Sequence, residues 1–198
     1  SAKLQGVKRI IAVDRVDERL ALAKSWGIET VDMREVDEVS DTLVDMTDGR
    51  GPDGVLDAVG MEAHGNPIAE KIVAGAARLP KPLGRKAIET AGIDRLDALH
   101  TAIHSVRRAG TVSVSGVYGG MADPMPMMEM FDKGITMRMG QCHVRHWTDE
   151  LLEIASRPED VLGLESLATH HVSLDDAPEA YKMFQEKKDG CLKVVLKP

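Results

Sequence analysis

Short runs of β-branched residues alternate with helical segments along most of the chain, and this alternation limits the possible folds more than any other feature. Residues 9–14 (RIIAVD) predict a strand, and residues 17–26 place apolar side chains at helical spacing before a stop at Gly27. The alternation continues through predicted strands at 30–33, 54–59, 111–115, 135–139, 167–172 and 192–196, and through predicted helices at 36–46, 94–108, 147–156 and 175–187. Strands that alternate with helices build a parallel sheet covered on both faces, so the sequence predicts an α/β fold with a doubly wound parallel sheet.

Two segments interrupt this alternation. Residues 61–93 contain the turn-forming run HGNP, several prolines and a small-residue helix predicted at 68–77. We interpret them as an insertion on the surface of the domain, because loops of this length are usually functional or form interfaces. Residues 121–131 (MADPMPMMEMF) are rich in Met and Pro, which favours a subunit contact over a place in the core.

Charge and composition exclude several classes of protein. The net charge is -7 without a basic stripe, which argues against nucleic-acid binding. There is no apolar run of about 18 residues, which argues against a membrane span. The only two cysteines, Cys142 and Cys191, form no disulfide framework, so a reducing cytoplasmic location is expected.

Asp14 ends the first predicted strand and is the first candidate for ligand binding. In nucleotide-binding βαβ units, an acidic residue at this place accepts hydrogen bonds from the ribose hydroxyls and disfavours a 2′-phosphate, which selects NAD over NADP. Arg15 and Arg19 follow on the next helical turn and could flank the adenosine. The alternative is that Asp14 caps the helix that follows.

The start of the chain affects this interpretation. A glycine-rich GxGxxG loop is expected about 20 residues ahead of the ribose-binding acid, and the chain begins too close to Asp14 to hold it. We therefore expect residues 1–5 to end the helix after that loop, and the first strand and loop of a Rossmann-like sheet to be absent. That strand is the central one in the order 3-2-1-4-5-6, so unpaired edges or an assembly with another chain are expected.

The last part of the chain carries the most specific motif. This part of the chain resembles the coenzyme domain of zinc-dependent medium-chain alcohol dehydrogenases, because it contains D-A-P-E-A-Y, then F, then K-V-V-L-K-P. Residues 7–32, 54–60 and 110–120 resemble the same domain. The insertion after Gly60 and the run GQCHV at 140–144 look most like the glutathione-independent formaldehyde dehydrogenase branch.

The resemblance implies a set of NAD-binding residues. Asp14 would bind the adenosine ribose with Arg19 beside it, and Val59 would lie near the adenine and ribose. Ser115 and Val117 would flank the backbone that holds the nicotinamide carboxamide. The remaining residues implied are His64, which stands where the branch usually has an arginine, Gly140, Gln141 and Cys142, which would complete the nicotinamide site, and Lys193, which could reach the pyrophosphate.

The resemblance also implies an activity. The intact enzyme would oxidise a small alcohol or aldehyde with NAD and zinc. The zinc ligands would come from a separate catalytic domain, so we expect no catalytic or metal-binding residue in this chain and no activity from the chain alone. Residues 1–140 would form most of the NAD-binding domain, and 141–198 would close it and return to the catalytic domain. Residues 121–140 would join subunits into a dimer or tetramer.

Two other interpretations remain. The chain could instead be a nucleotide-binding or assembly module without catalysis. His100 and His104 stand at a helical spacing that can hold zinc, but no third ligand accompanies them, so we favour an exposed helix face. Cys142 and Cys191 lack CxxC partners, and we expect them to pack as ordinary side chains.

Overall fold

The computed structural model describes residues 1–59, 96–118 and 124–198. The chain divides into two compact units, one formed by Ser1–Asp37 with His143–Pro198 and the other by Glu38–Cys142. Every strand pair in the described ranges is parallel, which confirms the predicted α/β class with parallel sheets. The insertion at 61–93, with its predicted helix at 68–77, lies outside the described residues. Within those ranges, no helix has the length and apolar character needed to cross a bilayer.

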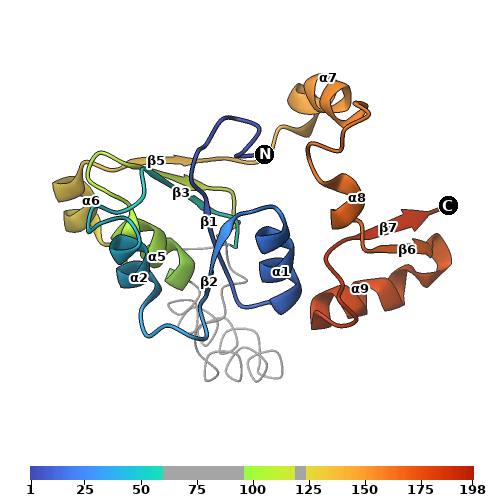
Figure 1. Cartoon of the computed structure of the whole chain (residues 1–198), viewed down its shortest axis with the longest axis horizontal. Helices are drawn as coiled ribbons and strands as arrows, with labels where there is room; N and C mark the ends of the chain where they lie inside the picture. Colours follow the sequence, from blue (N-terminus) through green and yellow to red (C-terminus); the bar gives the residue numbers. More distant parts are fainter. Residues whose placement is uncertain (60–95, 119–123) are drawn as a thin grey trace, which may run out of the picture. The chain divides into compact units, whose positions relative to one another are not determined.

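The first unit begins with a β-α-β element. Strand β1 (Ile11–Asp14) pairs with β2 (Glu29–Asp32), and helix α1 (Asp17–Ser25) packs on both strands (Figure 1). Leu20 of α1 is buried against them. Gly27 ends the helix with a φ of 68°, a left-handed conformation that glycine adopts without steric cost. The predicted strands, helix and stop are confirmed here.

The rest of the first unit contains a second parallel pair. Its elements are α7 (Val144–Ala155), α8 (Leu164–Leu167), β6 (His170–Ser173), the 3-10 turn η3 (Leu174–Asp176), α9 (Ala177–Glu186) and β7 (Val194–Lys197). Strand β6 pairs with β7, and α9 packs on both and buries Ala180. The Ser173 hydroxyl accepts a hydrogen bond from the Asp175 N–H, which starts the turn that leads into α9.

Helix α8 is not predicted from the sequence, and the strand predicted at 167–172 overlaps only its last residue. The Asp160 carboxylate accepts hydrogen bonds from the backbone N–H groups of Leu164 (2.7 Å) and Glu165 (2.9 Å). These bonds satisfy the first turn of a helix, and strand β6 begins only after it, at His170.

The second unit holds the larger core. Its elements are α2 (Val39–Asp45), β3 (Gly54–Asp57), α5 (Asp97–Ser105), β4 (Thr111–Val114), α6 (Met127–Lys133) and β5 (Thr136–Met139). The strands form one sheet in the order β3-β4-β5, and α5 packs on β3 and β4 while α2 packs on α5 (Figure 1). The core contains Leu96, Leu99, Ala102, Ile103, Val106, Val112 and Val114.

Helix α6 was not predicted, since the Met- and Pro-rich run was interpreted only as a contact segment. The helix begins after Pro126 and ends at Gly134, which has a φ of 63°. Met130 packs against the core from α6. Lys133 donates to the backbone oxygens of Ile103 (3.0 Å) and His104 (2.6 Å), which fastens α6 to the end of α5.

Candidate functional site

Three parallel strands of the second unit end at the same edge of their sheet. The segments that leave this edge are residues 58–59 after β3, 115–118 after β4 and 140–142 after β5. Ligands of doubly wound sheets bind outside the carboxyl ends of the strands. The structure brings six of the predicted site residues to this edge: Val59, Ser115, Val117, Gly140, Gln141 and Cys142.

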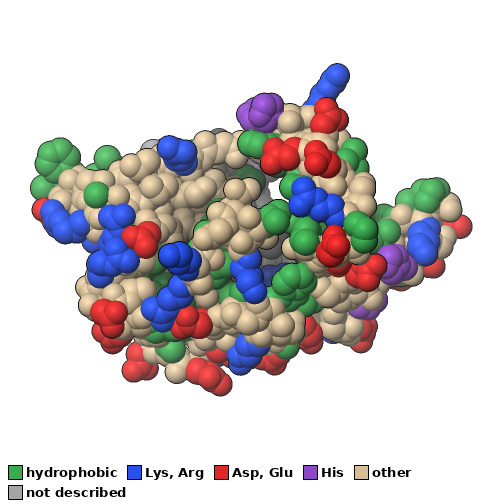
Figure 2. Space-filling view, turned by 45° about the horizontal axis from the view of Figure 1, so that its top comes forward, with side chains coloured by type: hydrophobic (Ala, Val, Ile, Leu, Met, Phe, Trp, Pro, Cys, Tyr) green, Lys and Arg blue, Asp and Glu red, His purple; other side chains and the backbone are tan. Residues whose placement is uncertain are grey.

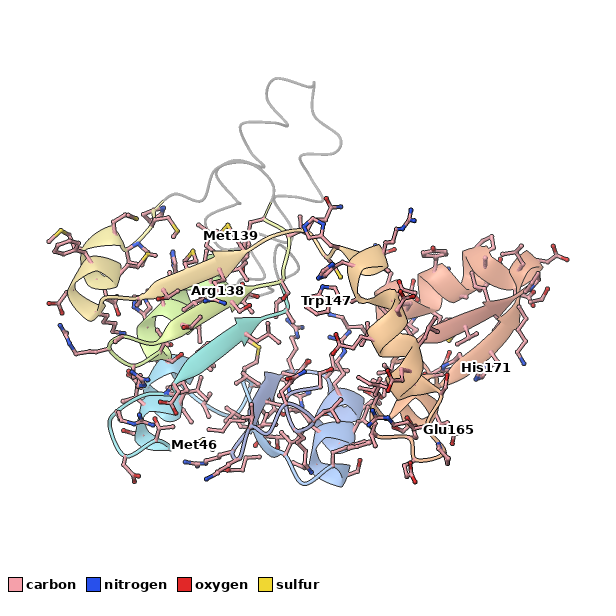
Figure 3. All side chains as sticks on the ribbon, turned by 90° about the horizontal axis from the view of Figure 1, so that it is seen from above. Met46, Arg138, Met139, Trp147, Glu165 and His171 are labelled. Carbon is pink, nitrogen blue, oxygen red and sulfur yellow. The ribbon has the colours of Figure 1, made fainter. Side chains whose placement is uncertain are left out.

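Their side chains are accessible to a ligand. Val59 is 47% exposed and Val117 is 78% exposed, although both are apolar. The Cys142 thiol is exposed as well. Figure 3 shows Arg138 and Met139 at the end of β5, directly before Gly140. An exposed apolar lining of this kind suits an aromatic ring rather than a phosphate group.

Asp57, which the sequence analysis missed, connects two of these segments. Its backbone oxygen accepts hydrogen bonds from the N–H groups of Ser115 (2.8 Å) and Gly116 (2.9 Å). Its side-chain Oδ1 accepts a bond from the Val59 N–H (2.9 Å). The residue is only 4% exposed, so these bonds are shielded from water. A single buried aspartate therefore fixes the backbone after β3 and after β4.

Tyr118 completes this cluster and was also missed. Its hydroxyl donates to Asp57 Oδ2 at 2.5 Å. Burial and the bond to Asp57 raise the pKa of Tyr118 far above its usual value, so the phenol stays protonated. The signal in the sequence was a strand-ending aspartate paired with a tyrosine just after the next strand, but their separation along the chain hides the pair.

Asp14 and Arg19 lie in the first unit, at the carboxyl end of β1. Asp14 Oδ1 accepts hydrogen bonds from the N–H groups of Arg15 (2.7 Å) and Val16 (3.0 Å). Arg19 Nη1 lies 3.6 Å from Asp14 Oδ2, and the Asp14 side chain is 27% exposed. Helix α1 has Val16 as its N-cap, whose own side chain makes no capping hydrogen bond, and Asp14 stabilises the turn before the helix through its bonds to Arg15 and Val16.

A second acidic strand end lies beside Asp14. Asp32 ends β2 opposite Asp14 in the register, and Arg34 binds both Asp32 and Asp17 of α1. The hydrogen bonds from Arg34 lower the pKa of Asp32 to about 2. Arg34 therefore pairs with Asp32, which is 14% exposed, and with Asp17, whereas the nearest arginine to Asp14 is Arg19, at 3.6 Å. The sequence analysis did not identify Arg34.

The two remaining predicted residues are placed as follows. Lys193 precedes β7, and its Nζ lies 5.9 Å from the centre of the Phe184 ring, a cation–π contact on the surface of the first unit. His64 lies outside the described residues. On the face shown in Figure 2, acidic and basic side chains are interspersed.

The run GRGPDG at 49–54 matches the GxGxxG pattern of a phosphate-binding loop, but it does not lie between a strand and a helix as that loop does. It precedes β3, whereas a phosphate loop follows a strand and opens a helix. Gly51 has a φ of 84°, and a Cβ there would collide with the backbone oxygen of Ser105. Gly51 therefore serves a tight turn against the end of α5.

The histidine pair of α5 is occupied by other contacts. His100 Nε2 lies 2.9 Å from the Pro124 oxygen, and His104 Nδ1 lies 2.6 Å from Glu129 Oε2. Among the residues that the structure describes, no three His, Cys, Asp or Glu side chains are grouped so that they could hold a metal ion. The pair joins α5 to the segment that contains α6. Of the two thiols, Cys191 is buried and Cys142 is exposed.

Comparison with known proteins agrees with this geometry. Residues 1–78 match the family model described as zinc-binding dehydrogenase. The chain is 32% identical, over 98% of its length, to an uncharacterized zinc-type alcohol dehydrogenase-like protein, AdhB, of Bacillus subtilis. Over these matches the chain is similar to zinc-binding dehydrogenases. It spans 47% of that relative, so it covers about half the length of a curated protein of this type.

Solved structures agree on the fold. The alcohol dehydrogenase TADH from Thermus sp. ATN1 superposes with a TM-score of 0.68 at 28% identity, covering 98% of this chain and 45% of that one. The similarity to a glutathione-independent formaldehyde dehydrogenase of Bacillus subtilis is narrower. It reaches 37% identity over 68 residues, which is 33% of this chain and 17% of that protein. The general resemblance is therefore confirmed, and the finer assignment to a formaldehyde branch stays a prediction.

Proposed function

We propose that this chain forms the coenzyme-binding part of an NAD-dependent dehydrogenase that acts on a small alcohol or aldehyde. The observation that carries the proposal is the shared sheet edge, where the segments after β3, β4 and β5 lie together and expose six of the predicted residues. That edge is where doubly wound sheets bind their ligands. When bound, NAD supplies the nicotinamide ring that exchanges hydride with the substrate.

Asp14 and Arg19 would bind the adenosine end. The Asp14 carboxylate is partly exposed, and its Oδ2 has Arg19 at 3.6 Å, which is longer than a strong hydrogen bond. Two ribose hydroxyls could therefore donate to this oxygen. A 2′-phosphate would meet the same negative charge, which supports NAD over NADP.

The other proposed contacts divide among the nicotinamide, the ribose or adenine, and the pyrophosphate. Ser115 and Val117, with Gly140, Gln141 and Cys142, would surround the nicotinamide, and Val59 would contact the adjacent ribose or adenine. Lys193 would reach toward the pyrophosphate, a role that suits an exposed cation. His64 belongs to the proposed set by resemblance alone.

Zinc would act in the intact protein through residues other than those described here. The described part of the chain offers no grouping of metal-binding side chains, so it does not fit a zinc site by itself. We expect the chain alone to have negligible dehydrogenase activity with formaldehyde or ethanol. Formaldehyde as the natural substrate rests on the partial similarity over 68 residues.

Titration of the labelled chain with NAD, followed by NMR, tests the proposal. We expect shifts at Asp14, Arg15 and Val16 and at residues 115–118, because these segments would meet the two ends of the cofactor. Asp14→Ala should weaken the binding, whereas Asp37→Asn, which removes another exposed carboxylate of the first unit, should not. Shifts confined to other surfaces, or none at all, would contradict the proposal.

Assembly through residues 121–140 is part of the same proposal. Helix α6 exposes Met127 (63%), Met128 (80%) and Phe131 (84%), which is a large apolar surface for so short a helix. A second copy of the chain would cover it in a dimer or tetramer. Analytical ultracentrifugation of the chain and of Phe131→Asp checks this, since the charged variant should dissociate. A cytoplasmic location and a boundary between residues 140 and 141 stay predictions.

A further inference from the structure

A cluster of hydrogen bonds around Asp57 holds the backbone at the candidate site. Asp57 bonds to Ser115 and Gly116 through its backbone oxygen, to Val59 through Oδ1 and to Tyr118 through Oδ2. The residues that it holds are those proposed to touch the cofactor, or their direct neighbours. Asp57 itself is 4% exposed and so does not reach a ligand.

Tyr118 closes the loop after β4. The chain leaves β4 at Val114, and the Tyr118 hydroxyl then returns to Asp57 at the end of the neighbouring strand. Residues 115–117 are thereby held at both ends, by the Ser115 and Gly116 N–H bonds on one side and by the phenol on the other. Without the hydroxyl, the hydrogen bond to Asp57 is lost, and this end of the loop keeps only the packing of the Tyr118 ring against the core.

The strength of this anchor comes from burial. A hydrogen bond to a carboxylate is stronger than one between neutral groups, and the shielding of Asp57 from water increases the difference. Binding loops that are already in the bound shape lose less entropy when the ligand arrives. A ligand that needs the 115–117 backbone in one geometry would therefore depend on a group that it never touches.

We propose that Asp57 and Tyr118 are positioning residues that hold the segment after β4 in the shape that receives the nicotinamide half of the cofactor, while Asp57 also fixes the neighbouring turn at Val59. The inference rests on the proposed function. A doubly wound fold binds a dinucleotide with two mononucleotide-binding halves. We assign the nicotinamide half to the β3-β4-β5 edge because Val117, which is apolar and 78% exposed there, suits a flat ring rather than a phosphate.

The test compares NAD with ADP-ribose, which lacks the nicotinamide ring, on the 198-residue chain. Tyr118→Phe removes one hydroxyl and keeps the ring, so it deletes the anchor with little change in packing. We expect the affinity for NAD to fall about fivefold, the value of one hydrogen bond, while the affinity for ADP-ribose stays unchanged. Tyr181→Phe is the matched control, because Tyr181 is 71% exposed on α9 and lies in the other unit.

Hydrogen exchange of the chain without ligand gives a second measurement. In Tyr118→Phe, the amides of Ser115, Gly116 and Val59 should exchange about tenfold faster, because the loop opens more often. The amide of Val112, inside the β4 ladder, should exchange at its original rate. Faster exchange throughout the unit would indicate general destabilisation and would overturn a positioning role.

The outcomes separate this inference from the function beneath it. If the unsubstituted chain binds neither NAD nor ADP-ribose, the proposed function fails and the inference falls with it. If NAD binds and Tyr118→Phe leaves the ratio of the two affinities unchanged, only the positioning role is overturned. If the unsubstituted chain binds NAD no better than ADP-ribose, the edge holds no nicotinamide and the inference is again wrong.

Discussion

The carboxyl ends of β1 and β3 each carry an aspartate whose Oδ1 accepts the N–H of the residue two positions on, Val16 in one case and Val59 in the other. The second oxygen distinguishes them. Oδ2 of Asp57 accepts the Tyr118 hydroxyl at 2.5 Å inside the protein. Oδ2 of Asp14 lies 3.6 Å from Arg19 on a side chain that is 27% exposed.

The same local turn therefore serves two purposes. An aspartate that ends a strand satisfies the backbone that follows it, because its short side chain reaches the N–H two residues on. Whether it also binds a ligand depends on the surroundings of its other oxygen. The strand end at Asp14 keeps that oxygen within reach of solvent, and the strand end at Asp57 uses it to hold a neighbouring loop.

Removing the two carboxylates should expose this difference most strongly. We expect Asp57→Ala to lower the free energy of unfolding by about 3 kcal/mol, because it leaves buried donors without their charged acceptor. Asp14→Ala should cost about 1 kcal/mol, since water can replace its bonds. Urea denaturation of both variants measures the two losses. Equal losses would show that burial does not distinguish the strand ends.

The preference for NAD over NADP should depend on Asp14 more than on Asp57. Asp14→Ser should weaken NAD binding about tenfold and reduce the preference over NADP, because the ribose acceptor and its charge are removed. Titrations with both dinucleotides give the ratio, and Asp37→Asn serves as a control for a general loss of charge. An unchanged ratio in Asp14→Ser would remove Asp14 from the proposed adenosine site.

The Tyr118 bond should persist at high pH. Because the pKa of Tyr118 is raised in the folded protein, its stabilisation is complete below the ordinary tyrosine value of about 10 and is lost as pH rises through the higher folded value. The chain has only two tyrosines, so Tyr181→Phe leaves Tyr118 as the sole phenol. Its ultraviolet titration should coincide with alkaline unfolding. Ionisation near pH 10 in a folded protein would contradict the buried bond.

A smaller effect is expected from an exposed aspartate near the start of β3. Hydrogen bonds from Arg50 and Arg107 lower the pKa of Asp53 to about 2. Its stabilisation is present above the unfolded value of 3.8 and is lost as pH falls to about 2. Asp53→Asn should therefore flatten the acid limb of the stability curve, moving the midpoint of unfolding by about 0.3 pH units.

Circular dichroism across an acid titration measures that shift. Asp37→Asn is again the control, as an exposed carboxylate in the other unit. An equal shift in both variants would attribute the effect to net charge rather than to the two arginines.

Much of the fold could be predicted because its signals are local. The strand at Asp14, the helix before Gly27 and the strand that begins near Thr111 follow from periodicity and a glycine stop, and the structure has them within a few residues. Helices α6 and α8 were missed for a physical reason. A Met- and Pro-rich run has no clear period, and the turn of α8 depends on Asp160, whose carboxylate lies outside the helix that it starts.

The candidate site divides in the same way. Asp14 could be recognised from its place at the end of an apolar run, whereas Val59, Ser115 and Val117 followed only from the resemblance to the dehydrogenases. The sequence could not indicate that Arg34 joins Asp17 to Asp32, or that Tyr118 returns to Asp57.

Asp14 ends its predicted strand, whereas Asp57 lies inside the strand predicted at 54–59, and the structure ends a strand at each of them. Only the tertiary structure decided that one stays accessible and the other is buried beneath a tyrosine. The reason is that burial and the partner of the second carboxylate oxygen are set by residues distant in the chain, which come together only when the sheet and its helices pack.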